Sequence, residues 1–182
     1  MKPFLFLLLP FLLSASETTE IRWSSSTPLT WADFTGVIDE TSERDAWTFS
    51  GFKYEYDWSE VDGKITWSMR AHSFFDRSKS WVKKNKKDAY LLAHEQLHFN
   101  ISELHCRYFK KRVANTTFTS NIDAELKAIY DEEFQKLLDA QIEYDEASDH
   151  YENEEGQLTW VEFVTEELSK LDKYKASNLF SE

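Results

Sequence analysis

The sequence has little of the residues that interrupt or cross-link a chain. Its 182 residues include only three prolines, four glycines and one cysteine. No proline or glycine stands between Asp88 and Val113, so nothing in that stretch breaks a helix. The single cysteine, Cys106, cannot form an intramolecular disulfide, and its apolar neighbours predict a buried, unreactive thiol.

Positive charge is also scarce. Lysine and arginine together number 21, against 33 aspartate and glutamate residues, which gives a formal net charge of −12. An acidic surface does not attract nucleic acids or anionic membranes, so neither is an expected partner. The one lysine-rich run, from Lys83 to Lys87, is interpreted as a solvated loop before a helix.

Long hydrophobic runs are absent except at the N-terminus. Lys2 precedes an apolar stretch, Phe4 to Leu13, and the small residues Ser14 to Ser16 follow it. This order is typical of a secretory signal peptide, and the run is too short to cross a membrane as an ordinary helix. We expect residues 1–16 to be a signal peptide and residues 17–182 to form one domain, periplasmic or secreted, with no membrane span after signal removal.

The first part of the expected domain has the pattern of antiparallel strands. Large apolar residues alternate with polar ones from Trp47 to Trp58 and again from Lys64 to Phe75. The dipeptide Asp62-Gly63 lies between these runs and favours a tight turn, so together they predict a β-hairpin. An edge strand of this hairpin could pair with an extended peptide substrate.

The second part has the spacing of helices. Apolar residues recur three and four positions apart from Asp88 to about Val113 and from Ile122 to about Ser148. Gly156 is expected to separate a third, C-terminal helix from the second. The predicted fold class is therefore α+β: an N-terminal antiparallel β-hairpin or small sheet, two long helices and a C-terminal helix. The expected core stripes are Tyr90, His94, Leu97, Ile101, Leu104 and Tyr108; Ile129, Phe134, Leu137, Leu138 and Ile142; and Val161, Val164, Leu168 and Leu171.

The first of these helices contains the sequence His94-Glu95-Gln96-Leu97-His98, an HExxH pattern. Residues four apart lie on one face of a helix, so His94 and His98 can aim two imidazole nitrogens at one metal ion. Glu95 lies beside His94 and can reach a water in the open position of that metal. The pattern predicts a zinc hydrolase, with Zn2+ as cofactor, two histidine ligands and a catalytic glutamate.

The same residues also have a purely structural interpretation. With five histidines in the chain, an HExxH pattern can arise by chance. His94 would then be a core histidine that is hydrogen-bonded within the protein, while Glu95 and His98 face water. This alternative requires no metal.

A catalytic zinc site needs a third protein ligand and an open fourth position. His150, at the end of the second helix, is the favoured third ligand, because an antiparallel return of that helix brings its end back towards the motif. His105 shares the face of His98 but lies about 10 Å further along the axis, and Glu103 points more than a quarter turn away. The acidic residues held in reserve lie on the second helix: Glu125, Glu132 and Glu133.

Four segments carry a family resemblance. They are Leu29–Gly36, Ser78–Val82, His94–Glu103 and Tyr144–His150, in that order. They resemble successive blocks of a secreted bacterial family called domain of unknown function 922, which is described as predicted secreted zinc-dependent proteases.

The resemblance implies roles for individual residues. It places metal-binding histidines at His94 and His98, a catalytic glutamate at Glu95 and a later histidine at His150. Tyr151 stands where the later block of the family usually has glycine.

Motif and resemblance together predict a compact, zincin-like zinc metallopeptidase that hydrolyses a peptide or protein substrate. The alternative is a non-catalytic exported protein of the cell envelope, either metal-binding or structural. In that protein His94 and His98 would hold a metal ion or a hydrogen-bond network without turnover.

Overall fold

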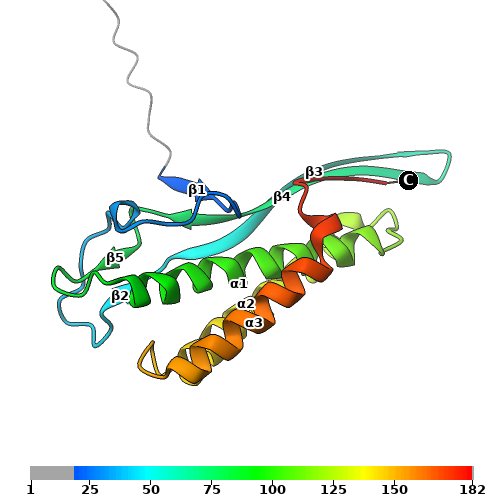
Figure 1. The fold of residues 1–182 in the computed structure, drawn as a ribbon. Helices are drawn as coiled ribbons and strands as arrows, with labels where there is room; N and C mark the ends of the chain where they lie inside the picture. The colour runs from blue at the N-terminus through cyan, green and yellow to red at the C-terminus, as the bar shows by residue number, and fades with distance from the viewer. Residues whose placement is uncertain (1–18, 182) are drawn as a thin grey trace, which may run out of the picture.

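The protein is built from an antiparallel sheet and a group of three helices (Figure 1). The structure is a computed structural model, and it describes residues 19–181. A long hairpin, β3 (Ser50–Val61) and β4 (Lys64–Asp76), lies along α1 (Ala89–Ala114), which confirms the predicted α+β class. The other elements are β1 (Glu20–Arg22), the 3-10 helix η1 (Trp31–Asp33), β2 (Ala46–Trp47), β5 (Trp81–Val82), α2 (Ile122–Ala147), α3 (Glu154–Lys170), the 3-10 helix η2 (Asp172–Tyr174) and β6 (Asn178–Phe180).

The hairpin forms where the alternating pattern predicted it. Its last pair is Val61 with Lys64, and the turn between them has positive φ at Asp62 (52°) and Gly63 (77°). Aspartate and glycine are among the residues that tolerate this left-handed region, which a tight hairpin turn needs. β4 is the central strand of the sheet, because it pairs with β3 on one edge and with β1 and β6 on the other.

α1 begins and ends within a residue or so of the predicted stretch. The side chain of Asp88 caps its N-terminus by accepting a hydrogen bond of 2.8 Å from the backbone N–H of Leu91. The hairpin packs on one side of α1, while α2 and α3 pack on the other (Figure 1). The middle of the helix is therefore buried, including the predicted core residues Leu97, Ile101 and Leu104.

Three of the expected core residues are exposed instead. Leu138 and Ile142 on α2 are 43% and 57% exposed, and Tyr90 in the first turn of α1 is 37% exposed. α2 buries the face that carries Leu126 and Leu137. This packed face is narrower than the apolar stripe, so residues at its margin meet solvent. The prediction that the whole stripe is core is wrong at these positions.

Gly156 does not separate two helices, as the sequence suggested, but lies in the first turn of α3. Asn153 caps this turn by accepting a hydrogen bond of 3.3 Å from the N–H of Gly156. A Cβ atom on Gly156 would lie 1.9 Å from the carbonyl oxygen of Ala147, the last residue of α2. Glycine is needed here because the two helix ends approach so closely.

The thiol of Cys106 lies fully inside the core. Burial raises its pKa to about 12. The thiolate form that reacts is therefore rare at neutral pH, and the predicted buried thiol is confirmed.

Within residues 19–181, no helix is both long enough and apolar enough to cross a membrane. The signal peptide expected over residues 1–16 lies outside the described residues and stays a prediction.

Replacing Gly156 with alanine is expected to lower the free energy of unfolding by about 2 kcal/mol, because the added methyl group pushes α3 away from Ala147. Thermal unfolding followed by circular dichroism should show a midpoint lowered by about 4–8 °C. Gly51→Ala is the control, since a Cβ there meets the Phe74 side chain at an ordinary 3.5 Å. Equal midpoints for the two variants would contradict a tight contact between α2 and α3.

Candidate metal centre

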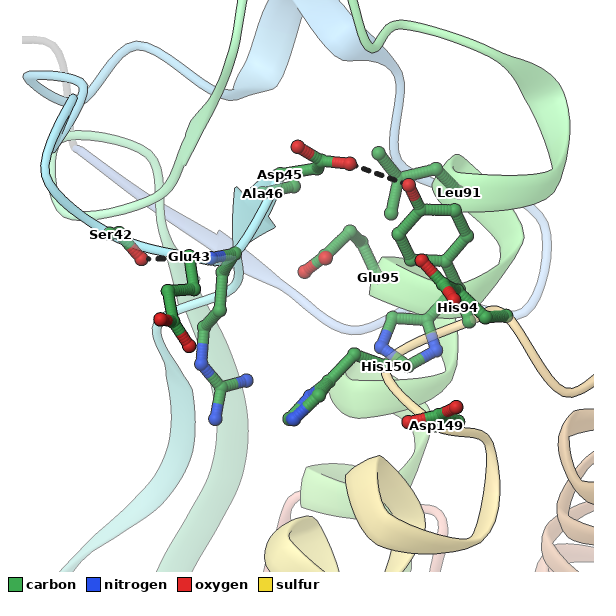
Figure 2. Close-up of a pocket in the computed structure, with 12 residues that line it drawn as sticks. Ser42, Glu43, Asp45, Ala46, Leu91, His94, Glu95, Asp149 and His150 are labelled. Atoms are coloured by element: carbon green, nitrogen blue, oxygen red, sulfur yellow. Dashed lines mark hydrogen bonds between the residues drawn. The ribbon is translucent and has the colours of Figure 1, made fainter.

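The second turn of α1 places His94 and Glu95 beside an open cavity (Figure 2). The cavity has a volume of about 490 Å³, and both residues on its wall are 3% exposed. His98 follows one turn later, and its Nε2 lies 3.1 Å from the Nε2 of His94. The i, i+4 spacing thus brings two imidazole nitrogens together on one face of the helix.

Two loops complete the cavity. One leads into β2, and the other connects α2 to α3. The hydroxyl of Tyr151 joins them by donating a hydrogen bond of 2.5 Å to the carboxylate of Asp45, and this bond raises the pKa of Tyr151 to about 12. The lining residues are Ser42, Glu43, Arg44 and Asp45 from the first loop, Ala46 from β2, Asp149, His150, Tyr151 and Glu152 from the second loop, and Leu91, His94 and Glu95 from α1.

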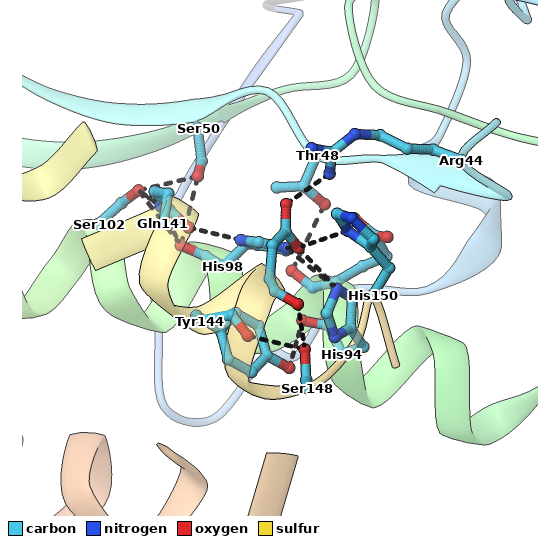
Figure 3. A network of polar contacts seen from close by, with 12 residues as sticks. Arg44, Thr48, Ser50, His94, His98, Ser102, Gln141, Tyr144, Ser148 and His150 are labelled. Carbon is cyan, nitrogen blue, oxygen red and sulfur yellow. Dashed lines mark hydrogen bonds and ion pairs between the residues drawn. The ribbon is translucent and has the colours of Figure 1, made fainter. Parts of the chain in front are cut away.

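The last turn of α2 adds Asp145 to the two histidines, which lie in the polar network of Figure 3. Its Oδ1 is 3.3 Å from the Nε2 of His94 and 3.1 Å from the Nε2 of His98. Its Oδ2 is held by Arg44 at 2.5 Å. Among the described residues, these three form the one group of His, Cys, Asp or Glu side chains placed to hold a metal ion. His94, His98 and Asp145 are called the metal group below.

The three atoms that face one another form a nearly equilateral triangle, with edges of 3.1, 3.1 and 3.3 Å. Two ligand atoms on a tetrahedral zinc ion, each about 2.0–2.1 Å from the metal, are roughly 3.3 Å apart. The Oδ1 of Asp145, one corner of this triangle, is buried but makes no directed hydrogen bond, which is costly unless another group satisfies it. Two imidazole nitrogens and a carboxylate oxygen at this spacing fit a divalent metal ion.

The charges of this group depend on one another. Burial by itself raises the pKa of Asp145, but its contacts with the two imidazoles and with Arg44 lower the pKa far below its usual range. Burial lowers the pKa of His94 and favours the neutral form that binds metals. Burial also acts to lower the pKa of His98, but Asp145 and Glu95 outweigh it and raise the pKa. The carboxylate of Asp145 thus favours positive charge next to it, and a bound metal ion would supply such a charge.

Neighbouring side chains orient the two imidazoles. The Nδ1 of His98 lies 2.5 Å from the amide oxygen of Gln141, a contact that favours a proton on Nδ1 and leaves Nε2 free to bind a metal. The ring of Tyr144 stacks on His94, with centroids 4.6 Å apart, and meets His98 edge to face at 4.9 Å. Both rings are thereby held with their Nε2 atoms towards Asp145.

Glu95 differs from the three possible ligands. Its carboxylate points into the cavity in Figure 2, and its Oε2 is buried without a hydrogen-bond partner. A carboxylate oxygen in this state can accept a proton from a water or a substrate in the cavity. Glu95 is therefore placed for acid–base chemistry.

His150 lies at the edge of the metal group and is not a member of it. Its side chain is 54% exposed, and its Nδ1 is 3.6 Å from the Oδ1 of Asp145. α2 does return antiparallel to α1 and brings its end to the motif, as the sequence suggested, but the residue that meets the two histidines there is Asp145. The sequence does not mark Asp145 as a ligand, because it is one of 33 aspartate and glutamate residues spread along the chain.

The remaining candidate ligands pair with other parts of the protein. His105, for example, places its Nδ1 2.8 Å from the carboxylate of Glu133. The partners of the other three candidates are Ser73 and Arg107 for Glu103, Thr119 for Glu125, and Arg112 and Lys136 for Glu132.

Residues 36–151 match the model of a family described as "Bacterial protein of unknown function (DUF922)". This chain belongs to the DUF922 family. The match contains all of α1 and α2, and with them every member of the metal group. Neither the curated proteins nor the solved structures gave a significant match.

The last matched residue, Tyr151, stands where the resemblance to the DUF922 family expects glycine. Its φ is 84°, and the two residues before it, Asp149 and His150, have φ of 46° and 52°. Three successive left-handed residues without a glycine are uncommon and strained, and such strain is concentrated at functional sites. The bond from Tyr151 to Asp45 helps to hold this DUF922 loop in place.

Replacing Asp145 with alanine is expected to weaken binding of a divalent transition metal by at least about 100-fold, because one of three ligands is lost. His150→Ala is the matched comparison, and we expect it to weaken binding by less than about 10-fold. The measurement is titration of the metal-free protein with Zn2+ in competition with a chromophoric chelator, with thermal unfolding to show that both variants fold. The reverse order of effects would assign the third ligand to His150.

Proposed function

We propose that this DUF922 protein is an exported zinc-dependent metallopeptidase. Its zinc ligands would be His94, His98 and Asp145, and Glu95 would be the general base. The observation that carries the proposal is the unpartnered, buried oxygen of Glu95 next to a triangle of ligand atoms at an open cavity. Three protein ligands beside an accessible space are typical of a catalytic zinc site, whereas structural sites are closed by four.

Each side chain has a distinct part in this chemistry. Bound zinc supplies a Lewis acid that polarises the scissile carbonyl and lowers the pKa of water towards neutrality. Glu95 accepts the proton of the attacking water and passes it to the leaving amine. Asp145 is ionised and His94 favours its neutral form, so these two donors already have the protonation states that metal binding requires.

The strand beside the cavity suits an extended peptide substrate. β2 pairs with β5 through one edge and with no other strand of the described chain. Arg44 and Asp45, which precede β2, and Ala46, its first residue, line the cavity. The second edge of β2 could therefore add a bound peptide as a further strand. The hairpin that the sequence suggested for this role does not line the cavity, and the hydroxyl of Tyr130 on α2 already bonds the Phe52 carbonyl of β3 at 3.2 Å. We therefore assign substrate pairing to β2.

Glu95→Gln is expected to reduce peptide hydrolysis by about 10²–10⁴-fold, because the variant cannot accept a proton. Its zinc content should stay the same, since Glu95 is not a ligand. The measurement is cleavage of an unfolded protein and of a mixed peptide pool by purified residues 17–182, with zinc determined by elemental analysis. Glu43→Gln is the control, because this exposed carboxylate lies on the same cavity wall.

Two other outcomes decide between this proposal and its rival. Stoichiometric zinc that is lost in His94→Ala, without hydrolysis of any peptide by the unaltered protein, would favour a non-catalytic exported metal-binding protein. Unchanged hydrolysis in Glu95→Gln would remove Glu95 from the mechanism.

A further inference from the structure

Lys110, near the end of α1, is a buried ammonium group with too few partners. The residue is 1% exposed, and its Nζ donates a hydrogen bond of 3.2 Å to the carbonyl oxygen of Ala176. A lysine ammonium has three N–H donors and is almost never fully buried unless a negative charge accompanies it. Within residues 19–181, no carboxylate forms an ion pair with Lys110. Its burial therefore requires a negatively charged partner of another kind.

A cavity of about 240 Å³ adjoins Lys110. It lies where β1, α1 and the segment before β6 meet. Arg22 and Lys175 also line it, and neither of these exposed side chains forms an ion pair within the described part of the chain. Serine hydroxyls, which can donate hydrogen bonds to a ligand, border the same space: Ser24, Ser25, Ser26 and Ser177.

The negative charge on this cavity wall is already neutralised. Glu103 is the one carboxylate among the described lining residues. Its Oε1 accepts a hydrogen bond of 2.7 Å from Arg107, and its Oε2 accepts one of 2.7 Å from the hydroxyl of Ser73. Lys110, Arg22 and Lys175 therefore leave the cavity positive, in a chain whose formal net charge is −12.

The histidine on the wall reflects this local charge. Burial lowers the pKa of His72, and the positive charges of Arg22 and Lys53 lower it further. His72 is thus a neutral hydrogen-bonding group at pH 7 and adds no fourth positive charge.

We propose that this cavity binds a small phosphate-type oxyanion, with Lys110 as its buried charge partner and with Arg22 and Lys175 at its mouth. Ammonium, guanidinium and hydroxyl donors together match the oxygen atoms of such an anion. The volume admits a phosphate group or a small phosphate monoester.

The site is separate from the metal centre. The two cavities share no lining residue. Lys110 also lies about 18 Å further along the axis of α1 than His98. Anion binding at Lys110 can therefore be tested independently of peptidase activity, and a negative result for one does not bear on the other.

The experiment is thermal unfolding of purified residues 17–182 with increasing inorganic phosphate, in buffer that contains a metal chelator. Because an anion that binds only the folded state stabilises it, the midpoint should rise by about 5–10 °C at about 100 times the dissociation constant. Sodium chloride at equal ionic strength should give no saturable rise. A parallel arm with glycerol phosphate distinguishes a phosphate monoester from free phosphate as the tighter ligand.

Lys110→Met removes the buried charge and keeps the length of the side chain. We expect this variant to lose the phosphate-dependent rise, while its midpoint without phosphate equals or exceeds that of the unaltered protein. Lys111→Met is the matched control on the same helix, where the side chain is exposed, and it should keep the full rise. If Lys110→Met does not fold, the double variant Arg22→Gln, Lys175→Gln serves instead, and we expect at least a tenfold weaker phosphate affinity.

Two results would overturn the proposal. One is a rise with phosphate and with glycerol phosphate that does not exceed the rise with chloride. The other is a saturable rise that survives in Lys110→Met or, where that variant does not fold, in the double variant.

Discussion

The burial of α1 is the constraint on which the rest of this structure depends. The hairpin covers one side of the helix, and α2 and α3 cover the other, so the buried polar side chains of α1 cannot reach bulk water and must find partners inside the protein. Along the helix, two histidines meet Asp145, Glu103 meets Arg107, and His105 meets Glu133. These contacts also fix how the other elements lie against α1, since the acidic partners of the histidines come from α2.

Two exceptions to this pairing lie beside cavities. Glu95 has a buried oxygen without a partner beside the larger cavity, and Lys110 has a single acceptor beside a smaller one. An incompletely satisfied buried group lowers stability, so a protein that keeps one has a use for it or a ligand that satisfies it. The carboxylate of Glu95 and the ammonium of Lys110 are both groups of this kind.

The loops around the metal group supply side chains that hold Asp145 and Tyr151, and backbone conformations that helices and strands do not adopt. The loop before β2 contributes Arg44, which holds the outer oxygen of Asp145, and Asp45, which binds the hydroxyl of Tyr151. The loop after α2 contributes three residues with positive φ. Rigid helices thus hold the candidate ligands, while strained loops shape the space in front of them.

Much of the fold and part of the site could be read from the sequence, because they depend on local patterns. Asp62-Gly63 between alternating runs determined the hairpin, and helical spacing around His94 and His98 determined α1 and the meeting of two imidazoles. The tertiary structure alone decided that Asp145 joins them, that His150 lies at the edge, and that Lys110 is buried beside a positive cavity. The physical reason is that the spacing of residues within one helix follows from its pitch, whereas the register between two helices depends on the packing of both.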